Sequence, residues 1–234
     1  MMMRLTAFVP LLVIMTGCTS LLHSNAPLEQ VYYLRARGAP PSESARPANL
    51  ASVRVGRPVA GPGLESSHIV LLESNLRMSY FTASRWPAAL PEVVEELMTE
   101  TLRASGSWLD VQNSDSAFPS DFLLQIRIRR FDADYASGSA GRGAAAPQIH
   151  VVFDCTLGRR SGREVIATFA AEGSASAAAN KLGDVVAAFE EAANSALASV
   201  AARAAEAAQA SGAAAPGAAA TRQNVDSPVT SIKR

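Results

Sequence analysis

The sequence predicts an α+β domain in which two main amphipathic helices cover one face of a largely antiparallel sheet. Three observations indicate this fold. Apolar residues alternate with period two in several stretches, most clearly over 122–129. They recur at helical spacing over 94–102 and again over 182–208. The order along the chain is strands, helix, strands, helix, which favours helices packed on a sheet built from hairpins.

Short strands are predicted in the first third of the chain. Residues 31–34 are β-branched and aromatic, which favours a first strand. Residues 53–59 alternate as in a half-buried strand, and Pro58 predicts that the pairing ends or bulges there because proline has no N–H to donate. Residues 69–72 and 76–81 are predicted to form two strands joined by a turn. Loops rich in glycine and proline are expected at 37–49 and 61–63.

The clearest helix of the first half begins near Pro91 and ends before Gly106. Proline suits a first helical turn, where its missing N–H costs nothing, and glycine is common just beyond a helix end. Glutamates gather early in this helix and Arg103 lies late, as the helix dipole favours. A single apolar stripe follows at helical spacing, formed by Val94, Leu97, Met98, Thr101 and Leu102.

A long strand opens the second half of the chain. One set of alternate residues over 122–129 is entirely apolar, and the other set is polar except for Leu123. Phe131 breaks this alternation, so a β-bulge is expected near Arg130. Residues 136–147, rich in Gly, Ala and Ser, are predicted to form a flexible loop.

A hairpin and a long helix complete the predicted domain. Residues 149–157 and 164–171 flank a basic turn from Arg159 to Arg163 and are expected to pair. That turn is either a solvated loop or a surface for an acidic partner. The helix is expected over about 182–208, with an apolar stripe formed by Leu182, Val185, Val186, Phe189, Ala193, Leu197 and Val200.

The start of the chain is interpreted as a lipoprotein signal. A single positive charge, Arg4, precedes an apolar run that ends in Thr16-Gly17-Cys18, the arrangement of a secretory signal with small residues before its cleavage point. Those three residues resemble a bacterial lipobox, after which the cysteine becomes the lipidated first residue. An ordinary signal peptide and a short membrane helix are the alternatives. The run is shorter than the roughly 17–25 residues that a spanning helix needs.

Four segments are therefore expected: a signal peptide over 1–17, a lipidated tether over 18–27, an α+β domain over 28–210 and a disordered tail over 211–234. The tail is expected to be disordered because Ala, Gly, Pro and polar residues dominate it, without an aromatic residue. Thr19 rather than aspartate follows the lipidated cysteine, which resembles the pattern of lipoproteins sorted to the outer membrane.

Charge and cysteine content limit the classes of partner. Removing residues 1–17 from the 234 leaves 217, with 20 basic and 21 acidic residues and a balance of −1. Nucleic-acid binding demands a basic footprint, which this balance does not supply. Membrane attachment then depends on the lipid at Cys18. Cys155 is left without a partner and is predicted to be buried and protonated among apolar neighbours, with a reactive thiol as the alternative.

The residues that catalysis or metal binding needs do not form recognisable motifs. The three histidines are His23, His68 and His150, and no G-x-S-x-G elbow accompanies them. His150 is expected on the polar side of its strand rather than as a base. Asp132 and Asp134 offer oxygens without a calcium-loop spacing, and no zinc motif or phosphate-binding loop is present. The sequence therefore assigns no catalytic residue, metal or cofactor.

Tyr80, Arg85 and Trp86 are the candidates for contact with a partner. Tyr80 shares one face of its predicted strand with Leu76 and Met78. Trp86 stands between a strand and a helix start, so two interpretations are open. It is either a core residue that locks the sheet to the helix or an exposed anchor, since Trp, Tyr and Arg are enriched at binding hot spots.

Several short motifs follow one another in a familiar order: Val53-Arg54-Val55, Ile69-Val70, Tyr80-Phe81, the segment 85–90 and the strand 124–131. This ordered set resembles the ABC-type transport auxiliary lipoprotein family, which includes the PqiC-like lipoproteins. The resemblance spans roughly Tyr32 to Ala201, together with the lipobox. In the family, the segment 85–90 usually reads Arg-Trp-Ala-Glu-Pro-Leu. Here Pro87 and Ala88 replace the Ala-Glu, so any role of that acidic residue does not carry over.

The resemblance implies a non-enzymatic component of an Mce-type lipid transport system. Such systems join an inner-membrane ABC transporter of permease and ATPase, a periplasm-spanning Mce-domain protein and an outer-membrane lipoprotein. The implied role is a docking subunit that faces the periplasm, held by Cys18, and supports envelope integrity. Contact with phospholipid and homo-oligomer formation stay open. The alternatives are a structural envelope or outer-membrane assembly lipoprotein without a transport partner, and a lipid hydrolase.

Overall fold

The computed structural model describes residues 28–37, 51–73, 75–135 and 146–213. The predicted signal peptide, the tether with Cys18, residues 214–234 of the predicted tail and most of the predicted loops at 37–49 and 136–147 lie outside these residues. The first three residues of the predicted tail, 211–213, belong instead to the last helix. The strands are β1 Gln30–Val31, β2 Ser52–Val55, β3 Val59–Ala60, β4 His68–Leu72, β5 Met78–Arg85, β6 Asp110–Gln112, β7 Phe122–Asp134, β8 Gln148–Arg159 and β9 Glu164–Ser176. The helices are α1 Leu90–Ala104 and α2 Leu182–Ala213.

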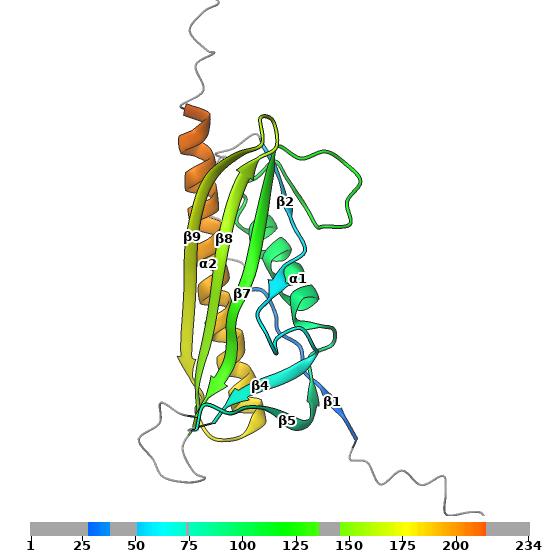
Figure 1. The fold of residues 1–234 in the computed structure, drawn as a ribbon, viewed down its shortest axis with the longest axis vertical. Helices are drawn as coiled ribbons and strands as arrows, with labels where there is room; N and C mark the ends of the chain where they lie inside the picture. Colours follow the sequence, from blue (N-terminus) through cyan, green and yellow to red (C-terminus); the bar gives the residue numbers. More distant parts are fainter. Residues whose placement is uncertain (1–27, 38–50, 74, 136–145, 214–234) are drawn as a thin grey trace, which may run out of the picture.

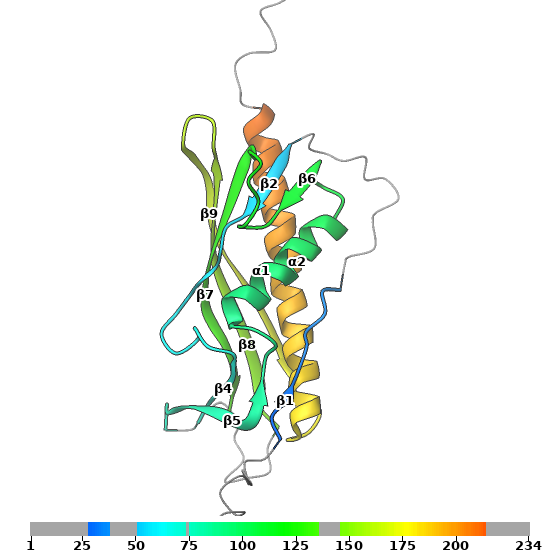
Figure 2. The same ribbon diagram turned by 90° about the vertical axis from the view of Figure 1, so that its right-hand side faces the viewer.

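The sheet is built around β7 (Figure 1). On one side β7, β8 and β9 form a long antiparallel meander, and on the other side the short strands β2, β3 and β4 pair with β7 in parallel. Figure 2 shows both helices on the same side of this meander. The predicted α+β class, a mostly antiparallel sheet with two helices packed against it, is confirmed. The short parallel pairings were not predicted.

The bulge expected in the central strand is present. The register between β7 and β8 shifts between Ile128 and Arg130. The residues that alternate before the shift, ending at Ile128, and Phe131 after it are all buried. One extra residue therefore lets β7 keep the same apolar side toward the helices on both sides of the bulge.

Helix α1 follows the predicted pattern closely. Pro91 lies in its first turn and Gly106, with φ 63°, lies two residues beyond its end, where glycine adopts the left-handed conformation at no steric cost. The predicted stripe from Val94 to Leu102 is buried. Glu95 is buried as well, and the backbone N–H of Ser114 donates a hydrogen bond of 2.7 Å to its Oε1.

Helix α2 approaches the sheet closely because the side chains between them are small. Alanines fill much of its buried side, and Gly173 on β9 faces it. A Cβ at Gly173 would lie 2.0 Å from the carbonyl oxygen of Ala192 and 2.9 Å from the backbone nitrogen of Ala196. The helix backbone therefore rests directly on the strand at this point.

The segment from Leu28 to Arg37, which we call the strap, differs from the predicted strand at 31–34. Gln30 and Val31 pair in parallel with the end of β5, and the N–H of Tyr32 donates one further hydrogen bond, of 2.9 Å, to the carbonyl of Arg85. Side chains of α2 replace the strand partner further along, because Glu190 and Asn194 face the backbone of the strap. The N–H of Arg35 donates to Glu190 Oε2 at 3.3 Å, the N–H of Arg37 donates to Asn194 Oδ1 at 2.6 Å, and Asn194 Nδ2 donates to the carbonyl of Arg35 at 2.9 Å.

The predicted strand 76–81 also begins later than expected. β5 starts at Met78, and Leu76 lies in the turn with φ 62° and 77% of its side chain exposed. Leu76 therefore does not continue the face of Met78 and Tyr80, both of which are also exposed. The turn therefore takes up two more residues than the alternation of apolar residues suggested, because the strand begins at Met78 and not at Leu76.

The buried cysteine behaves as predicted. Cys155 on β8 is 1% exposed and has no disulfide partner among the described residues. Burial, with a smaller contribution from the nearby Asp154 carboxylate, raises the pKa of the Cys155 thiol to about 12. The thiol is therefore protonated and unreactive at neutral pH.

Candidate partner-binding surfaces

Trp86 lies in the core. Its side chain is 1% exposed, and its ring makes edge contacts with Phe131 of β7 at 6.1 Å and Phe189 of α2 at 5.4 Å between centroids. Its backbone N–H donates to the carbonyl of Ser67 at 2.7 Å. The sequence left two interpretations of Trp86 open, a core residue and an exposed anchor. The structure shows the core residue, which locks the sheet to the helix. A partner does not reach this side chain in the folded domain.

Tyr80 and Arg85 remain at the surface of β5. Tyr80 is 44% exposed, and its ring lies 4.9 Å from that of His68 on β4, centroid to centroid. Arg85 Nε donates to Glu29 Oε2 at 2.7 Å, which ties the strap to the sheet. Tyr80 thus presents an aromatic ring to solvent, whereas the Arg85 guanidinium is engaged within the domain.

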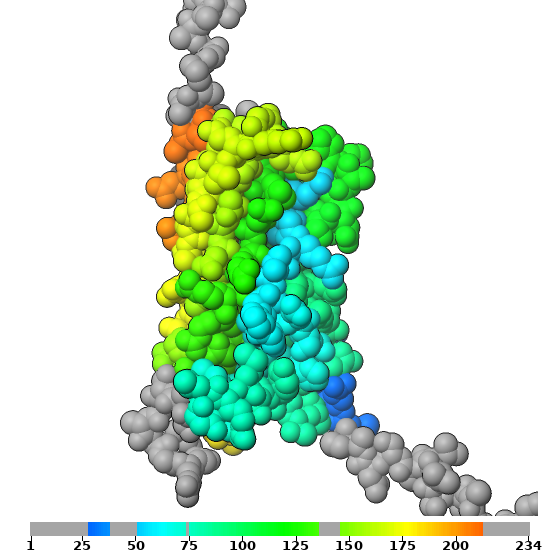
Figure 3. Space-filling model, in the orientation of Figure 1, coloured from blue at the N-terminus to red at the C-terminus, as the bar shows by residue number. Residues whose placement is uncertain are grey.

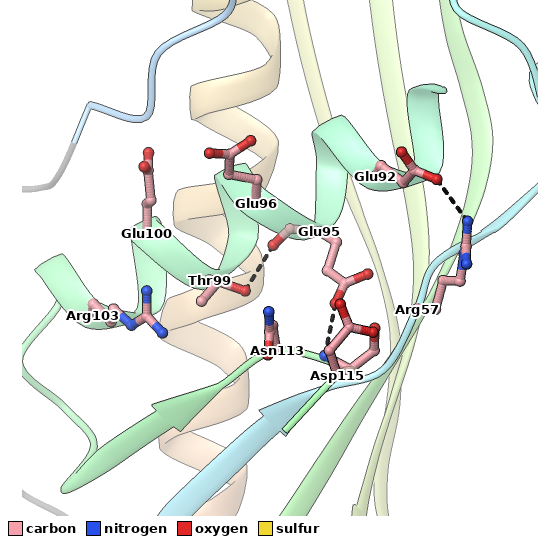
Figure 4. A pocket seen from close by; sticks show the side chains of 10 residues that line it. Arg57, Glu92, Glu95, Glu96, Thr99, Glu100, Arg103, Asn113 and Asp115 are labelled. Carbon is pink, nitrogen blue, oxygen red and sulfur yellow. Dashed lines mark hydrogen bonds and ion pairs between the residues drawn. The ribbon is translucent and has the colours of Figure 1, made fainter. Parts of the chain in front are cut away.

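A groove of about 450 Å³ runs along α1 (Figure 4). One side is helix α1, where Glu92, Glu96 and Glu100, spaced by four residues, form a row along the rim, and Glu95 points toward the opposite side of the groove. The other side is the segment after β6. Carboxylates outnumber guanidinium groups in the lining, which consists of Arg57, Glu92, Glu95, Glu96, Thr99, Glu100, Arg103, Asn113, Ser114 and Asp115.

The charges in this groove are only partly neutralised. Arg57 pairs with Glu92 at 2.7 Å, and Arg103 donates to the carbonyl of Val111. Within the described residues no ion pair reaches the carboxylates of Glu96 or Glu100. The row of glutamates is visible in the sequence as an i, i+4, i+8 pattern. The approach of Arg57 and Asp115 depends on tertiary structure, so the sequence alone did not reveal the groove.

The basic turn between β8 and β9 borders a second cavity, of about 400 Å³. Arg159 is engaged there, since it pairs with Glu164 at 3.3 Å and donates to the carbonyl of Ser211 near the end of α2. Arg160 and Arg163 are exposed. Both interpretations of this turn from the sequence, a solvated loop or a surface for an acidic partner, fit this arrangement.

The two aspartates considered as metal ligands are instead bound by an arginine. Arg130 donates through Nε and Nη2 to the two carboxylate oxygens of Asp132, at 3.0 and 2.8 Å, and through Nη2 to Asp134 at 3.2 Å. These contacts raise the pKa of the Arg130 guanidinium, Asp132 contributing most. His150 lies on the polar side of β8, with Nε2 3.9 Å from Asp134 Oδ2. In residues 28–37, 51–73, 75–135 and 146–213 no group of three or more potential ligands is placed to hold a metal ion.

Neither of the two described helices is long and apolar enough to cross a membrane. Cys18 lies outside the described residues.

Solved structures of other proteins have a similar fold. No curated protein matches the chain. The structure is similar to that of protein XCC0632 from Xanthomonas campestris, with 20% identity, a TM-score of 0.69 and coverage of 79% of this chain and 99% of that chain. A second solved structure, of an uncharacterized protein, has 11% identity, a TM-score of 0.56 and coverage of 77% and 98%. At these identities the two structures show a shared fold.

The family comparison covers most of the chain. Residues 32–226 match the family model described as the ABC-type transport auxiliary lipoprotein component. The matched region includes every described helix and all strands after β1, together with Tyr80, Arg85 and the groove along α1. The chain therefore belongs to the family of auxiliary lipoprotein components of ABC-type transport systems.

Proposed function

We propose that this protein is the outer-membrane lipoprotein of an Mce-type ABC lipid transport system and serves there as a non-catalytic docking subunit. The observation that carries the proposal is the family match over residues 32–226, preceded by the lipobox-like Thr16-Gly17-Cys18. A lipid on Cys18 holds the domain at the membrane, on the periplasmic side. ATP hydrolysis and the movement of lipid belong to other subunits in this arrangement.

The acidic groove along α1 is the surface that best suits a protein partner. It is concave and carries a row of carboxylates, of which Glu96 and Glu100 are exposed and not neutralised within the described domain. Charges arranged in this way steer a partner of opposite charge and fix its register more than they add affinity. The occupant we propose is a basic segment of the Mce-domain protein. Tyr80 and Arg85 on β5 form the second candidate surface.

Site-specific photo-crosslinking in the native envelope tests this proposal. The crosslinking side chain replaces Glu96 in the groove, Tyr80 on β5, or Thr168 on the exposed side of β9 as the control position. We expect position 96 to capture the Mce-domain protein and position 168 to capture no component of the transport system. Capture at position 80 instead would move the docking surface to β5.

Two outcomes would overturn the proposal. The first is that no Mce-domain or ABC component is captured at any position while outer-membrane assembly factors are, which would favour the structural lipoprotein. The second is that deletion of the protein disturbs barrel assembly while the distribution of phospholipid stays normal. Crosslinks between copies at position 80 or 96 would identify that surface as a homo-oligomer interface and exclude it as the docking site.

A further inference from the structure

The exposed large apolar side chains are concentrated at one end of the domain. Ten such residues are exposed within the described chain, and six of them lie in the strap and in the β4–β5 turn and strand that follow. Isolated exposed apolar residues are normal, but a cluster of them marks a contact surface. Five of these six form the cluster that we call the apolar end: Leu28, Val31, Leu76, Met78 and Tyr80, whereas Tyr33 lies further along the strap.

These residues share an end because β5 runs across the domain. Figures 1 and 2 show β1, β4 and β5 together at the lower end, with β5 crossing beneath the long meander. Val31 pairs with Arg85 at the last residue of β5, and Leu76 lies just before its first residue. Figure 3 shows the surface of this end formed by the β4–β5 region and the strap.

The backbone at Leu76 is unusual for its residue type. Its φ of 62° is a conformation that glycine or asparagine adopts at less cost, and 77% of its side chain is exposed. Neither local backbone preference nor core packing accounts for a leucine at this position. A leucine at the tip of an exposed turn gains stability only if another apolar phase covers it.

The ionic groups of the apolar end neutralise each other. Arg77 pairs with Glu73 in the turn, and Arg85 pairs with Glu29 of the strap. The end therefore presents apolar side chains with no net charge from these four groups. Such a surface suits a zwitterionic lipid layer and does not require anionic headgroups.

The length of the chain before the strap limits which end meets the membrane. Residues 18–27 span at most about 35 Å when fully extended. Helix α2 has 32 residues and is about 48 Å long, and it runs from the lower end to the opposite end. The tether joins the domain at Leu28, at the lower end. If the domain stood with its opposite end on the membrane, Leu28 would be further from the membrane than the tether can reach, so that orientation is excluded.

We propose that the apolar end lies in the headgroup region of the lipid layer that holds the Cys18 anchor, with Leu76 inserted deepest. This inference rests on the proposed lipidation of Cys18. Tyr80 then meets lipid rather than the Mce-domain protein, which leaves the groove along α1 for that partner. The long axis of the domain stands away from the membrane, with the basic β8–β9 turn at the periplasmic end.

Depth-dependent fluorescence quenching tests this orientation. The full-length lipidated protein is placed in nanodiscs of phosphatidylcholine, with an environment-sensitive probe on Leu76→Cys, Leu28→Cys or, as controls, Val165→Cys and Phe118→Cys. Both controls are exposed apolar positions, 64% and 74%, outside the apolar end. The wild-type chain should take no probe, because Cys18 carries lipid and Cys155 is buried with a thiol pKa of about 12.

We expect spin-labelled lipid to lower the fluorescence at positions 76 and 28 by about twofold or more and to leave positions 165 and 118 nearly unchanged. Raising the salt concentration should not reverse this result, since apolar contact and not charge drives it. Quenching at position 28 alone would show that only the tether is near the lipid and would overturn the inference. Equal quenching at positions 76 and 165 would overturn it as well.

The outcomes separate this inference from the proposed function. An anchored protein that is not quenched at position 76 rejects the orientation and leaves the docking role intact. Quenching at position 76 without capture of any transport component in the crosslinking experiment rejects the docking role and leaves the orientation intact. A chain that does not stay on the nanodisc removes the anchor on which both depend.

Discussion

Trp86 shows how one side chain can join three elements. It follows β5 directly, and its indole packs on aromatic rings of β7 and α2. We expect Trp86→Ala to lower the free energy of unfolding by about 3–5 kcal/mol, because it leaves a large cavity between the sheet and the helix. Trp86→Phe should lower it less. Urea unfolding measures both variants.

The control for Trp86 is the neighbouring exposed ring. Tyr80→Ala should cost about 1 kcal/mol or less, since this side chain is 44% exposed. If Trp86→Ala cost no more than Tyr80→Ala, the conclusion that the indole holds the sheet and the helix together would be wrong.

Cys155 gives the stability of the domain a defined pH dependence. Its thiol pKa is raised from 9.0 to about 12 in the folded state. Below pH 9 both states keep the proton, and this group does not affect stability. Between pH 9 and pH 12 the unfolded chain releases the proton while the folded domain holds it. The free energy of unfolding should therefore fall by up to about 1.4 kcal/mol per pH unit in this window.

A difference between two proteins isolates this contribution of Cys155. Lysines, tyrosines and arginines also titrate above pH 9, so urea unfolding of the wild type is compared with that of Cys155→Ala at each pH. The two curves should run parallel below pH 9 and converge above it. Parallel curves up to pH 12 would mean that the folded domain does not hold the thiol proton.

The close contact between helix α2 and strand β9 depends on a single glycine. Gly173 allows it, because any Cβ there would meet backbone atoms of Ala192 and Ala196, which cannot rotate away. We expect Gly173→Ala to lower the free energy of unfolding by about 3 kcal/mol or more, at the upper end of overpacking effects. Urea unfolding is the measurement, with Ser174→Ala on the exposed side of β9 as a control that should change stability by about 0.5 kcal/mol or less.

The strap depends on α2 as much as on the sheet. Glu190 is buried beside the strap. Its carboxylate accepts a hydrogen bond from the backbone N–H of Arg35 and forms an ion pair with the guanidinium of Arg37. Removing the carboxylate in Glu190→Ala should release the strap while the rest of the domain stays folded. Hydrogen exchange should then accelerate about tenfold or more at the amides of Arg35 and Arg37.

The control for the strap is Glu191→Ala, one residue along α2 and exposed. It should leave exchange in the strap unchanged. Equal acceleration in both variants would indicate a general loss of helix stability, and the assignment of Glu190 as the residue that holds the strap would be wrong.

The elements that could be predicted from the sequence are those in which the spacing of apolar residues along the element itself shows which side faces the core. Helix α1 and the bulge near Arg130 are of this kind, because the stripe and the broken alternation record which side faces the core. The strap could not be predicted as it is, since Glu190 and Asn194, more than 150 residues away, take the place of a strand. The turn after β4 was predicted, but its extension through Leu76 was not, because the left-handed backbone there has no glycine to mark it.

For the candidate binding surfaces too, residues could be proposed from the sequence, but their surroundings depended on tertiary structure. Tyr80 was chosen from the sequence as a candidate for partner contact, and the structure places it at the surface. Trp86 could be assigned to the core or the surface only from the positions of Phe131 and Phe189. The groove along α1 was not predicted. Its glutamates are regular in the sequence, but Arg57 and Asp115 reach the helix from positions 35 residues before and 23 residues after Glu92 in its first turn.

For the molecule as a whole, attachment is predicted to depend on one residue. Cys18→Ala removes the proposed site of lipidation, and multiple acyl chains are what makes anchoring by lipid stable. We expect the variant to disappear from the outer-membrane fraction and to lose function in transport, with the urea unfolding of its domain unchanged. Fractionation of the envelope measures the first effect. A variant that stayed at the outer membrane and functioned normally would contradict both the anchor and the docking role.

The strap also decides how the molecule responds to mechanical load. In the proposed role, with the domain held at one membrane and bound to a partner, tension would act through Cys18 and would reach the strap before any other part of the domain. The strap is fixed by a two-residue strand and a few side-chain bonds, whereas the core behind it is closed by the 13-residue strands β7 and β9. Its release would add ten residues, about 35 Å, to the tether without opening the core. The domain would thereby accommodate changes in the distance between membrane and partner while it stays folded.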